Sequence, residues 1–378
     1  MQWQVPLFDP DLGEAEIAAL TAVIRSKWLT QGEQTERFER TFAGFVGSEY
    51  GVALNSATAA LHLALMAHGV GPRDEVICPS LTFVATANAI RYCGAQPIFA
   101  DVDSADCWNI SATGIEACIT PATRAVIVVH YAGHMCDMPA IMALAARHGL
   151  KVIEDVAHAP GATLAGRAAG NWGDAGCFSF FSNKNMTTAE GGMLTTNHEA
   201  VAKAAQRLRC HGMTSVTLDR HKGHNFSYDV TDLGYNYRMS ELNACIGLVQ
   251  LEHLAERNQK RAMLSTYYRR KLNARGLVAV PFEKPLGTGS FHIFPVLLPA
   301  HVERGTVMAG LRDQGIQSSI HYRPIHTFTN FVDNGSARHP LPLTDMIGAR
   351  ELTLPLYPSM SEPQVDLVCD TLHSLIGG

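Results

Sequence analysis

Residues 177–193 read Cys177-Phe-Ser-Phe-Phe-Ser-Asn-Lys-Asn-Met-Thr-Thr-Ala-Glu-Gly-Gly-Met193. An apolar strand is expected over residues 177–181, followed by a polar turn with a single lysine, Lys184, and two glycines. A second strand is expected over residues 193–196. A lysine in such a turn lies at the mouth of a sheet, where desolvation leaves an amine neutral enough to attack a carbonyl. The stretch therefore predicts a nucleophilic lysine.

A second residue, Asp155, indicates which chemistry this lysine could perform. Asp155 ends another apolar strand, Leu150-Lys-Val-Ile-Glu-Asp155. A lysine that forms a Schiff base and an aspartate that keeps a pyridine nitrogen protonated are the minimal equipment of an enzyme that uses pyridoxal 5′-phosphate (PLP). Either residue alone carries little information. Together they predict a PLP site with Lys184 as its catalytic residue.

Short apolar strands alternate with helical patterns from about residue 50 to 200. Strands are expected over 51–54, 75–78, 96–101, 125–129, 151–154, 177–181 and 193–196, and helices over 57–68, 83–92 and 138–148. This alternation predicts an α/β fold with right-handed crossovers and a mainly parallel sheet covered on both faces. Ligands of such sheets bind beyond the carboxyl ends of the strands. Four polar residues fall near those ends: Asn55, Thr82, His130 and Asp155.

The length of 378 residues exceeds one ordinary domain, so two domains are expected. A large cofactor-binding domain with an N-terminal segment is predicted over residues 1–256, and a smaller α+β domain over 257–378. A long helical pattern over 240–272 connects them. Within the smaller domain, strands are expected over 290–298 and 318–322, and helices over 305–314 and 362–376.

Composition excludes several classes of protein. The net charge of −5 gives no reason to expect nucleic acid or an anionic membrane as a partner. No signal peptide is expected, because residues 1–9 lack a basic stretch followed by an apolar run, and no apolar segment approaches the length of a membrane span. The nine cysteines are odd in number and form no Cys-x-x-Cys pair, which indicates reduced thiols. A cytoplasmic protein is predicted.

Other motifs in the sequence do not support a different class of enzyme. Gly69-Val-Gly71 does not open a helix after a strand, so a dinucleotide fingerprint is excluded. His130-Tyr-Ala-Gly-His134 follows a strand and contains glycine, which argues against a zinc-binding helix. No Walker A and no Gly-x-Ser-x-Gly sequence occurs. His321 and His326 are interpreted as substrate-pocket or structural residues.

Two segments have both a functional and an ordinary interpretation. Asn55-Ser-Ala-Thr-Ala-Ala-Leu61 can bring backbone N–H groups at a helix N-terminus onto an anion, or Ser56 or Thr58 can simply cap that helix. Phe83 follows a strand end, where it can stack on a flat heteroaromatic ring or belong to the core. Neither segment decides the matter alone.

Several blocks nevertheless occur together and in order. They are Asn55-Ser-Ala-Thr-Ala-Ala-Leu61, Pro79-Ser-Leu-Thr-Phe-Val-Ala-Thr-Ala-Asn88, Glu154-Asp-Val-Ala-His-Ala-Pro-Gly-Ala162, Ser179-Phe-Phe-Ser-Asn-Lys-Asn185 with Glu190-Gly-Gly192, and Gly234-Tyr-Asn-Tyr-Arg-Met239. Trp28-Leu-Thr-Gln-Gly32 and His321-Tyr-Arg-Pro-Ile-His326 extend the match over nearly the whole chain. This pattern resembles the DegT/DnrJ/EryC1/StrS group, PLP-dependent sugar aminotransferases of the type I (aspartate aminotransferase) fold.

The resemblance implies a role for each matching residue. Lys184 would form the Schiff base and later shuttle a proton. Asp155 would bind the pyridinium nitrogen. Phe83 would stack on the ring, where many members of the group carry tryptophan. His158, often glutamine in the group, would lie near the ring's 3-hydroxyl, unless it is a packed core histidine.

The resemblance also implies how the cofactor phosphate is held and how subunits assemble. Thr58, Ala59 and the Ser179 hydroxyl would hold the phosphate. Asn236 would reach the phosphate of a partner subunit, because the active site of the group lies at a dimer interface. A homodimer is therefore expected.

The implied reaction moves an amino group from an amino acid, L-glutamate, to a keto-sugar, a nucleotide-linked 3- or 4-keto-6-deoxyhexose. Alternatives are a keto-cyclitol of the scyllo-inosose type with glutamine as donor, or a regulator that binds PLP without catalysis. Intact Lys184 and Asp155 argue against the regulator. Some relatives carry histidine in place of the lysine and are sugar dehydratases, so the lysine favours transamination.

Substrate contacts are the least constrained part of the site. The basic segment Arg220-His-Lys-Gly-His224 precedes Gly234 in a long polar connection. Arg220 and Lys222 are natural partners for the diphosphate of a nucleotide sugar, although a solvated loop is an equal alternative. His321 is expected to contact the substrate.

Overall fold

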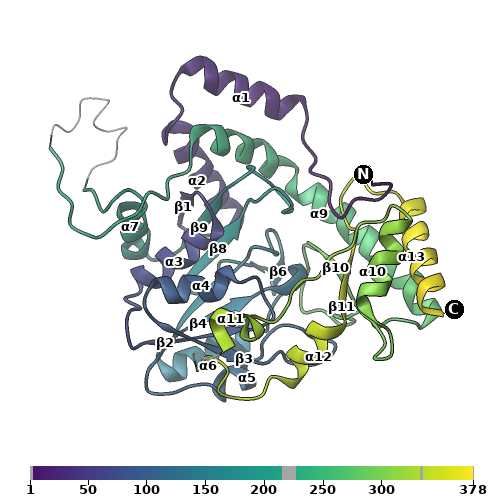
Figure 1. The fold of residues 1–378 in the computed structure, drawn as a ribbon. Helices are drawn as coiled ribbons and strands as arrows, with labels where there is room; N and C mark the ends of the chain where they lie inside the picture. Colours follow the sequence, from purple (N-terminus) through teal and green to yellow (C-terminus); the bar gives the residue numbers. More distant parts are fainter. Residues whose placement is uncertain (1–2, 215–226, 333–334, 378) are drawn as a thin grey trace.

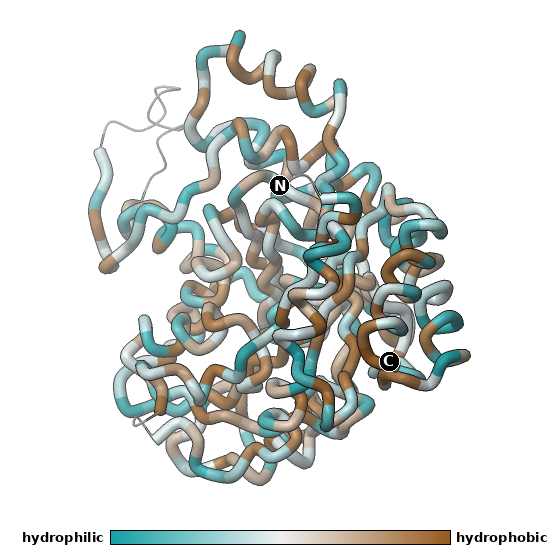
Figure 2. Tube along the Cα trace, turned by 45° about the vertical axis from the view of Figure 1, so that its right-hand side comes forward, coloured by the Kyte–Doolittle hydropathy of each residue, from teal (hydrophilic) through white to brown (hydrophobic). Residues whose placement is uncertain are grey.

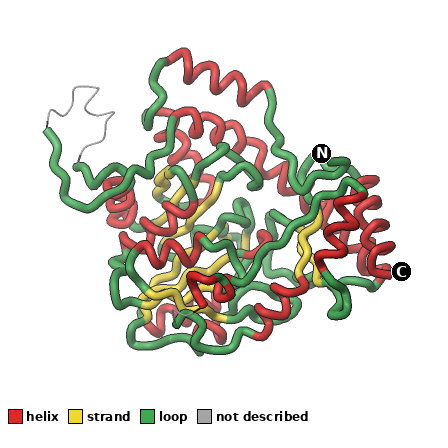
Figure 3. Tube along the Cα trace, in the orientation of Figure 1, coloured by secondary structure: helices red, strands yellow, loops and turns green. Residues whose placement is uncertain are grey.

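The computed structural model describes residues 3–214, 227–332 and 335–377. Figure 1 shows a large α/β unit around a central sheet, with a smaller unit beside it that holds both termini. The two groups of strands stand apart in Figure 3, where helices surround each of them. Among the described residues, no helix has the length and apolar character needed to cross a bilayer.

The large sheet has seven strands in the order β1-β9-β8-β5-β4-β2-β3. They are β1 (Tyr50–Leu54), β2 (Glu75–Pro79), β3 (Gln96–Ala100), β4 (Thr123–Val129), β5 (Lys151–Asp155), β8 (Ala175–Ser179) and β9 (Gly192–Thr196). β9 is antiparallel to both of its neighbours, and the remaining pairs are parallel. The predicted mainly parallel sheet is confirmed.

Helices cover both faces of this sheet, because the strands are apolar on both faces. One face packs against α2 (Glu33–Val46), α5 (Ala112–Glu116), α6 (Met138–His148) and the first half of α9 (Glu241–Arg275). The other face packs against α3 (Ala57–Ala67), α4 (Ala85–Tyr92) and α7 (Glu199–Leu208). This arrangement confirms the predicted α/β fold.

The smaller unit is built around a two-stranded sheet. Its strands, β10 (Phe294–Leu297) and β11 (Glu351–Leu354), are antiparallel. They pack with α10 (Arg304–Asp313), α13 (Glu362–Gly377) and the second half of α9, and Val5 from the N-terminal segment joins the same core. α9 runs unbroken from the core of the large unit to the core of the smaller one, so no break in the chain marks a boundary between them. The division into residues 1–256 and 257–378 is therefore a proposal.

The remaining elements are short connections or lie at the periphery. They are α1 (Glu14–Ser26), η1 (Tyr131–Gly133), β6 (Thr163–Leu164), β7 (Arg167–Ala168), η2 (Ile325–Thr327), α11 (Thr329–Val332) and α12 (Pro342–Arg350). α1 packs on α9 along one face and exposes Ile17 and Ile24. In Figure 2 hydrophobic and hydrophilic stretches alternate along this helix at the top of the molecule.

Strand register brings the functional turns to one edge of the sheet. Asp155 at the end of β5 pairs with Val129 of β4 and with Cys177 of β8. β9 runs in the opposite direction, so its first residue, Gly192, lies at that same edge beside Ser179 and Leu54. A Cβ at Gly192 would lie 2.3 Å from the backbone carbon of Ser56, so only glycine fits where the turn before α3 crosses.

Sequence-based expectations differ from the structure in several places, and the strand expected over residues 290–298 is confined to β10. No strand forms over residues 318–322; Ser319 makes one isolated bridge with Thr353. The ladder stops there because the His321 N–H donates to the Glu351 carboxylate (2.8 Å) instead of a strand carbonyl. The helix expected from Phe83 begins at Ala85, which leaves Phe83 in the preceding turn.

Candidate active site

A cavity of about 540 Å³ lies beyond the carboxyl ends of β4, β5 and β8. Several residues that the sequence singled out line it together: Thr58, Phe83, Asp155, His158, Ser179, Lys184 and His321. They come from separate turns that strand register collects at one edge, and His321 arrives from the smaller unit. The structure thus assembles most of the predicted site in one place.

Lys184 lies in the turn between β8 and β9. Its backbone N–H donates to the Phe181 carbonyl (2.9 Å), which closes the turn. Its side-chain Nζ lies 3.3 Å from Nε2 of His292. Burial lowers the pKa of this amine from its usual 10.5 to about 8, and the nearby Asp155 opposes that shift. An amine with such a pKa is partly neutral near physiological pH and can act as a nucleophile or a base.

Asp155 is buried at the end of β5, with 6% of its surface exposed. Its Oδ1 accepts from the Ala157 N–H (3.1 Å) and its Oδ2 from the Thr86 hydroxyl (2.9 Å). Burial raises the pKa of this carboxyl, while the two hydrogen bonds and the Lys184 charge oppose that rise. Carboxylate oxygens can accept further bonds, so a cationic ring nitrogen in the cavity would stabilise the ionised form.

His158 is buried against Tyr322 from the smaller unit. Its Nδ1 accepts from the Ala132 N–H (3.3 Å), so its Nε2 carries the proton and donates to the Tyr322 hydroxyl (2.9 Å). Burial holds the pKa of His158 well below its usual range, so the ring is neutral. His158 is therefore hydrogen-bonded at both nitrogens and also lines the cavity.

The N-terminus of α3 opens on the same cavity. Ser56 is its N-cap, because the Ser56 hydroxyl accepts from the Ala59 N–H (3.1 Å). Thr58 lines the cavity beside it. On the neighbouring turn the Ser179 hydroxyl accepts from the Phe181 N–H (3.4 Å). Helix N–H groups and hydroxyls gathered in this way suit an anion such as a phosphate.

Phe83 is not a core residue. Its side chain is 58% exposed and lines the cavity, with its ring centroid 5.9 Å from that of Tyr322. An exposed aromatic ring at the mouth of a cavity suits stacking on a flat heteroaromatic molecule.

A second cavity, of about 740 Å³, adjoins the first and shares Ser56, Thr58 and Glu190 with it. Tyr235 and Tyr237 stack on its wall, with ring centroids 4.9 Å apart. Asn236, between them, is exposed and does not line the Lys184 cavity of its own chain; its carbonyl accepts from the Asn55 side chain (3.4 Å).

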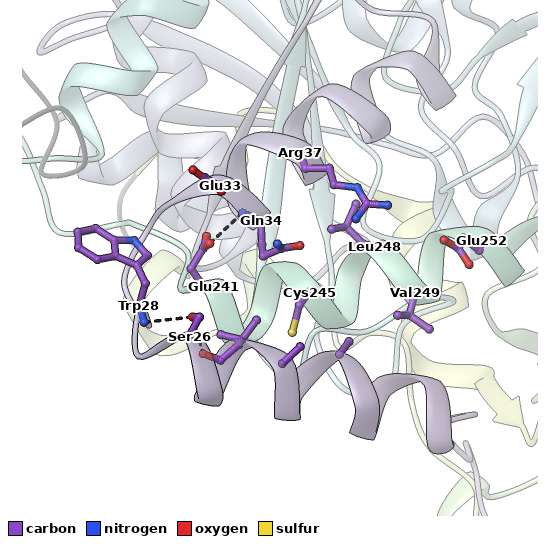
Figure 4. A pocket seen from close by; sticks show the side chains of 13 residues that line it. Ser26, Trp28, Glu33, Gln34, Arg37, Glu241, Cys245, Leu248, Val249 and Glu252 are labelled. Carbon is purple, nitrogen blue, oxygen red and sulfur yellow. Dashed lines mark hydrogen bonds between the residues drawn. The ribbon is translucent and has the colours of Figure 1, made fainter. Parts of the chain in front are cut away.

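A third cavity, of about 610 Å³, lies between α1, α2 and α9, away from these residues (Figure 4). Trp28, the first residue of the Trp28–Gly32 motif, lines this cavity. The Glu241 carboxylate at the start of α9 accepts from the Gly32 and Gln34 N–H groups (2.9 and 2.8 Å). A Cβ at Gly32 would collide with the Trp28 ring. The motif therefore anchors the N-terminal segment to α9.

Among the described residues that the sequence raised, His326 and His130 do not line the Lys184 cavity. Arg220 and Lys222 fall outside the described residues. His326 binds the Ser80 hydroxyl (2.8 Å) and Asp345 (2.9 Å), which is a structural role. His130 donates to the buried Glu154 carboxylate (3.0 Å). Within residues 3–214, 227–332 and 335–377 no group of three or more His, Cys, Asp or Glu side chains is placed to hold a metal ion.

Three further residues contact the predicted site and were not singled out from the sequence. His292 lies against Lys184, Tyr322 lies against His158, and Thr86 binds Asp155. Tyr322 and Thr86 fall inside the blocks that carry the resemblance, so those blocks held a signal. His292 falls in the expected strand 290–298, where no sequence motif indicated a functional residue.

Comparison with known proteins agrees with this chemistry. The family model of the DegT/DnrJ/EryC1/StrS aminotransferases matches residues 10–373. The spore coat polysaccharide biosynthesis protein SpsC of Bacillus subtilis is 39% identical over 99% of this chain and 97% of its own. Spr1654 of Streptococcus pneumoniae, solved in its PMP form, is 30% identical over 99% of each chain with a TM-score of 0.92, and its PLP form also matches.

A third relative has a named pathway. Helicobacter pylori PseC, an aminotransferase involved in the biosynthesis of pseudoaminic acid, is 27% identical over all of both chains, with a TM-score of 0.91. The residues around Lys184 and Asp155 fit PLP, because they offer an amine, a buried carboxylate and an anion site on one cavity. Since the family model also spans nearly the whole chain, this protein belongs to the DegT/DnrJ/EryC1/StrS family and is a PLP-dependent sugar aminotransferase.

Proposed function

We propose that this enzyme moves an amino group from L-glutamate to a nucleotide-linked 3- or 4-keto-6-deoxyhexose, giving 2-oxoglutarate and an amino sugar. The observation that carries the proposal is the placement of Lys184 and Asp155 on one cavity that adjoins a second one through Ser56, Thr58 and Glu190. The joined space suits an acceptor larger than an amino acid. The names of SpsC, for spore coat polysaccharide biosynthesis, and of PseC, for the biosynthesis of pseudoaminic acid, support a role in sugar biosynthesis.

We assign the residue roles as follows. When bound, PLP supplies a carbonyl that an amine can attack and a ring that accepts an electron pair. Lys184 would hold the cofactor and carry a proton between its carbon and that of the substrate. Asp155 would keep the ring nitrogen protonated. Phe83 would cover one ring face, and His158 would lie near the 3-hydroxyl.

The phosphate of the cofactor would lie at the N-terminus of α3. Thr58, Ala59 and the Ser179 hydroxyl would hold it from one subunit. Thr58 and Ser179 line the Lys184 cavity, whereas Ala59 lines the adjoining one and its N–H donates to the Ser56 hydroxyl. Asn236 would complete the site of the partner subunit, because it is exposed beside the second cavity and away from the Lys184 cavity of its own chain. We therefore propose a homodimer, located in the cytoplasm.

Three residues are proposed to meet the substrate: His321, Arg220 and Lys222. His321 lines the cavity beside Lys184. Arg220 and Lys222 would bind the diphosphate of a nucleotide sugar through charge-assisted hydrogen bonds. Alanine at either position should then raise KM for the sugar and leave the glutamate half-reaction unchanged.

A substrate panel tests the proposal. Purified enzyme is incubated with glutamate or glutamine and with nucleotide-linked keto-sugars or scyllo-inosose, and mass spectrometry detects the aminated product. We expect product from glutamate with a nucleotide sugar. Product only from scyllo-inosose with glutamine would establish the cyclitol alternative. Bound PLP without turnover of any pair would indicate a regulator.

A further inference from the structure

His292 contacts the amine of Lys184 from outside the predicted site. It lies in the buried segment before β10, with 4% of its surface exposed. Its Nε2 is 3.3 Å from Lys184 Nζ, and its Nδ1 is 3.0 Å from Oδ1 of Asn185, the residue after the lysine. The imidazole thus joins the lysine to the amide that follows it in the chain.

The amide of Asn185 fixes the proton on His292. Its Nδ2 donates to the Ser290 carbonyl (2.7 Å) and to Oδ1 of Asn258 (2.8 Å). Both amide hydrogens are therefore used, and a flipped amide would set an oxygen against the Ser290 carbonyl. Oδ1 of Asn185 must then accept, so Nδ1 of His292 carries the proton. The lone pair of Nε2 consequently points at Lys184.

The imidazole ring of His292 is neutral. The titratable and charged groups that face it are Lys184, His158, His321 and Arg261, whose guanidinium donates to the His292 carbonyl (3.2 Å). Burial first, and then these neighbours, hold the pKa of His292 well below its usual range. A neutral ring with this tautomer accepts a hydrogen bond from the amine and does not take its proton.

We propose that His292 is a positioning residue for Lys184: it binds one N–H of the amine when that amine is free and so directs the amine lone pair. The proposal rests on the function proposed above, in which Lys184 alternates between holding the cofactor and moving a proton. A lysine released from a covalent bond has a flexible four-carbon chain, and a fixed acceptor reduces its orientations. The relay from Asn258 through Asn185 to His292 fixes that acceptor.

Matched variants separate positioning from packing. In His292→Gln the side-chain terminus falls near the place of Nε2, so an acceptor for Lys184 is kept. In His292→Asn the amide falls near the place of Nδ1, so that acceptor is lost. His134→Asn is the control, because His134 is another buried neutral histidine, stacked on Phe282 at a centroid distance of 4.3 Å. Thermal melting of each variant reports any general loss of structure.

The first readout needs no turnover. Lys184 in the full-length, cofactor-free protein is acylated over a range of pH, and peptide mass spectrometry follows its labelling. A neutral acceptor stabilises the ammonium more than the amine, so its loss should lower the pKa of Lys184. We expect His292→Asn to shift the labelling profile downward by about one pH unit and His292→Gln and His134→Asn to leave it within about 0.3 units.

A second readout tests the tautomer. Histidine-selective 15N labelling should show a His292 signal, identified by its loss in His292→Gln, with Nδ1 protonated and Nε2 bare between pH 6 and 9. In the holoenzyme, kcat should fall about tenfold or more in His292→Asn, with both KM values nearly unchanged and partial rescue in His292→Gln.

The outcomes separate this proposal from the function on which it rests. If borohydride fixes the cofactor on another lysine, the role of Lys184 fails. If Lys184 carries the cofactor but its labelling profile is the same in all three variants, or Nε2 of His292 is protonated, the positioning role is overturned.

Discussion

Asp155, at the end of β5, and Lys184, in the turn that follows the neighbouring strand β8, line one cavity. Asp155 pairs with Cys177 across β5 and β8, and β8 leads directly into the turn that carries Lys184. Their charges interact, since Asp155 opposes the fall in the lysine pKa that burial causes. The register of two strands therefore places a carboxylate and an amine where both could contact the same bound cofactor.

Replacing Asp155 with Asn should cut the rate about a hundredfold or more, which corresponds to about 2.7 kcal/mol in the barrier. The amide removes the charge that would keep the ring nitrogen protonated, while its oxygen can still accept from the Ala157 N–H and its NH2 group can donate to the Thr86 hydroxyl. Single-turnover kinetics with glutamate measure the loss. Near-normal rates in Asp155→Asn would mean that the pyridinium role belongs elsewhere.

Mixing two inactive variants should restore activity if Asn236 serves the partner subunit. A heterodimer of Asn236→Ala and Lys184→Ala would hold both lesions in one site and neither in the other. We expect recovery approaching half the activity per heterodimer after subunit exchange, measured by product formation. Confirmed exchange without recovery would point to sites built within one chain.

Glu154 should matter for stability through its buried hydrogen bonds. Its carboxylate accepts from the backbone N–H groups of Gly170, Trp172 and Gly173 and from His130. Glu154→Gln turns an amide hydrogen towards some of these donors, so a loss of about 2–4 kcal/mol in the free energy of unfolding is expected. Urea denaturation measures it, with the exposed Glu116→Gln as control. Equal stability of both variants would contradict the importance of this network.

The buried amine of Lys184 should also destabilise the cofactor-free fold at neutral pH. Its pKa is about 8 when folded and 10.5 when unfolded, so the folded state binds fewer protons between those values. Stability should therefore be lowest below pH 8 and recover as pH rises towards 10.5. We expect Lys184→Met to gain about 1–2 kcal/mol at pH 7, allowing for partial exposure, and little at pH 10.

Melting curves of the cofactor-free protein at both pH values test this, with the exposed Lys260→Met as the control. A gain from Lys184→Met that is equal at pH 7 and pH 10 would mean that the amine is not desolvated in the folded chain.

The sequence predicted the large sheet because buried parallel strands contain continuous apolar runs, as in residues 125–129 of β4. It predicted Lys184 and Asp155 because both lie at the ends of such runs. The strand over 318–322 was wrong, since the Glu351 carboxylate takes the His321 N–H from the ladder. Apolar character alone does not reveal such a side-chain competitor.

His292 could not be predicted as a neighbour of Lys184. The two residues are 108 positions apart, and His158 and Tyr322 are 164 apart. Contacts of this range depend on how the smaller unit packs over the strand ends, which local sequence patterns do not encode. The sequence also left two interpretations of Phe83, as a core residue or as a ring that lines a cavity. Its exposure depends on where α4 begins, which the local pattern did not predict.

Reduction of the purified enzyme with borohydride tests the central role of Lys184 most directly. The reagent fixes the cofactor covalently on whichever lysine holds it, and peptide mass spectrometry locates the modified residue. We predict that the modified peptide contains Lys184 and that Lys184→Ala gives no modified peptide. Modification of any other lysine would contradict the site described here.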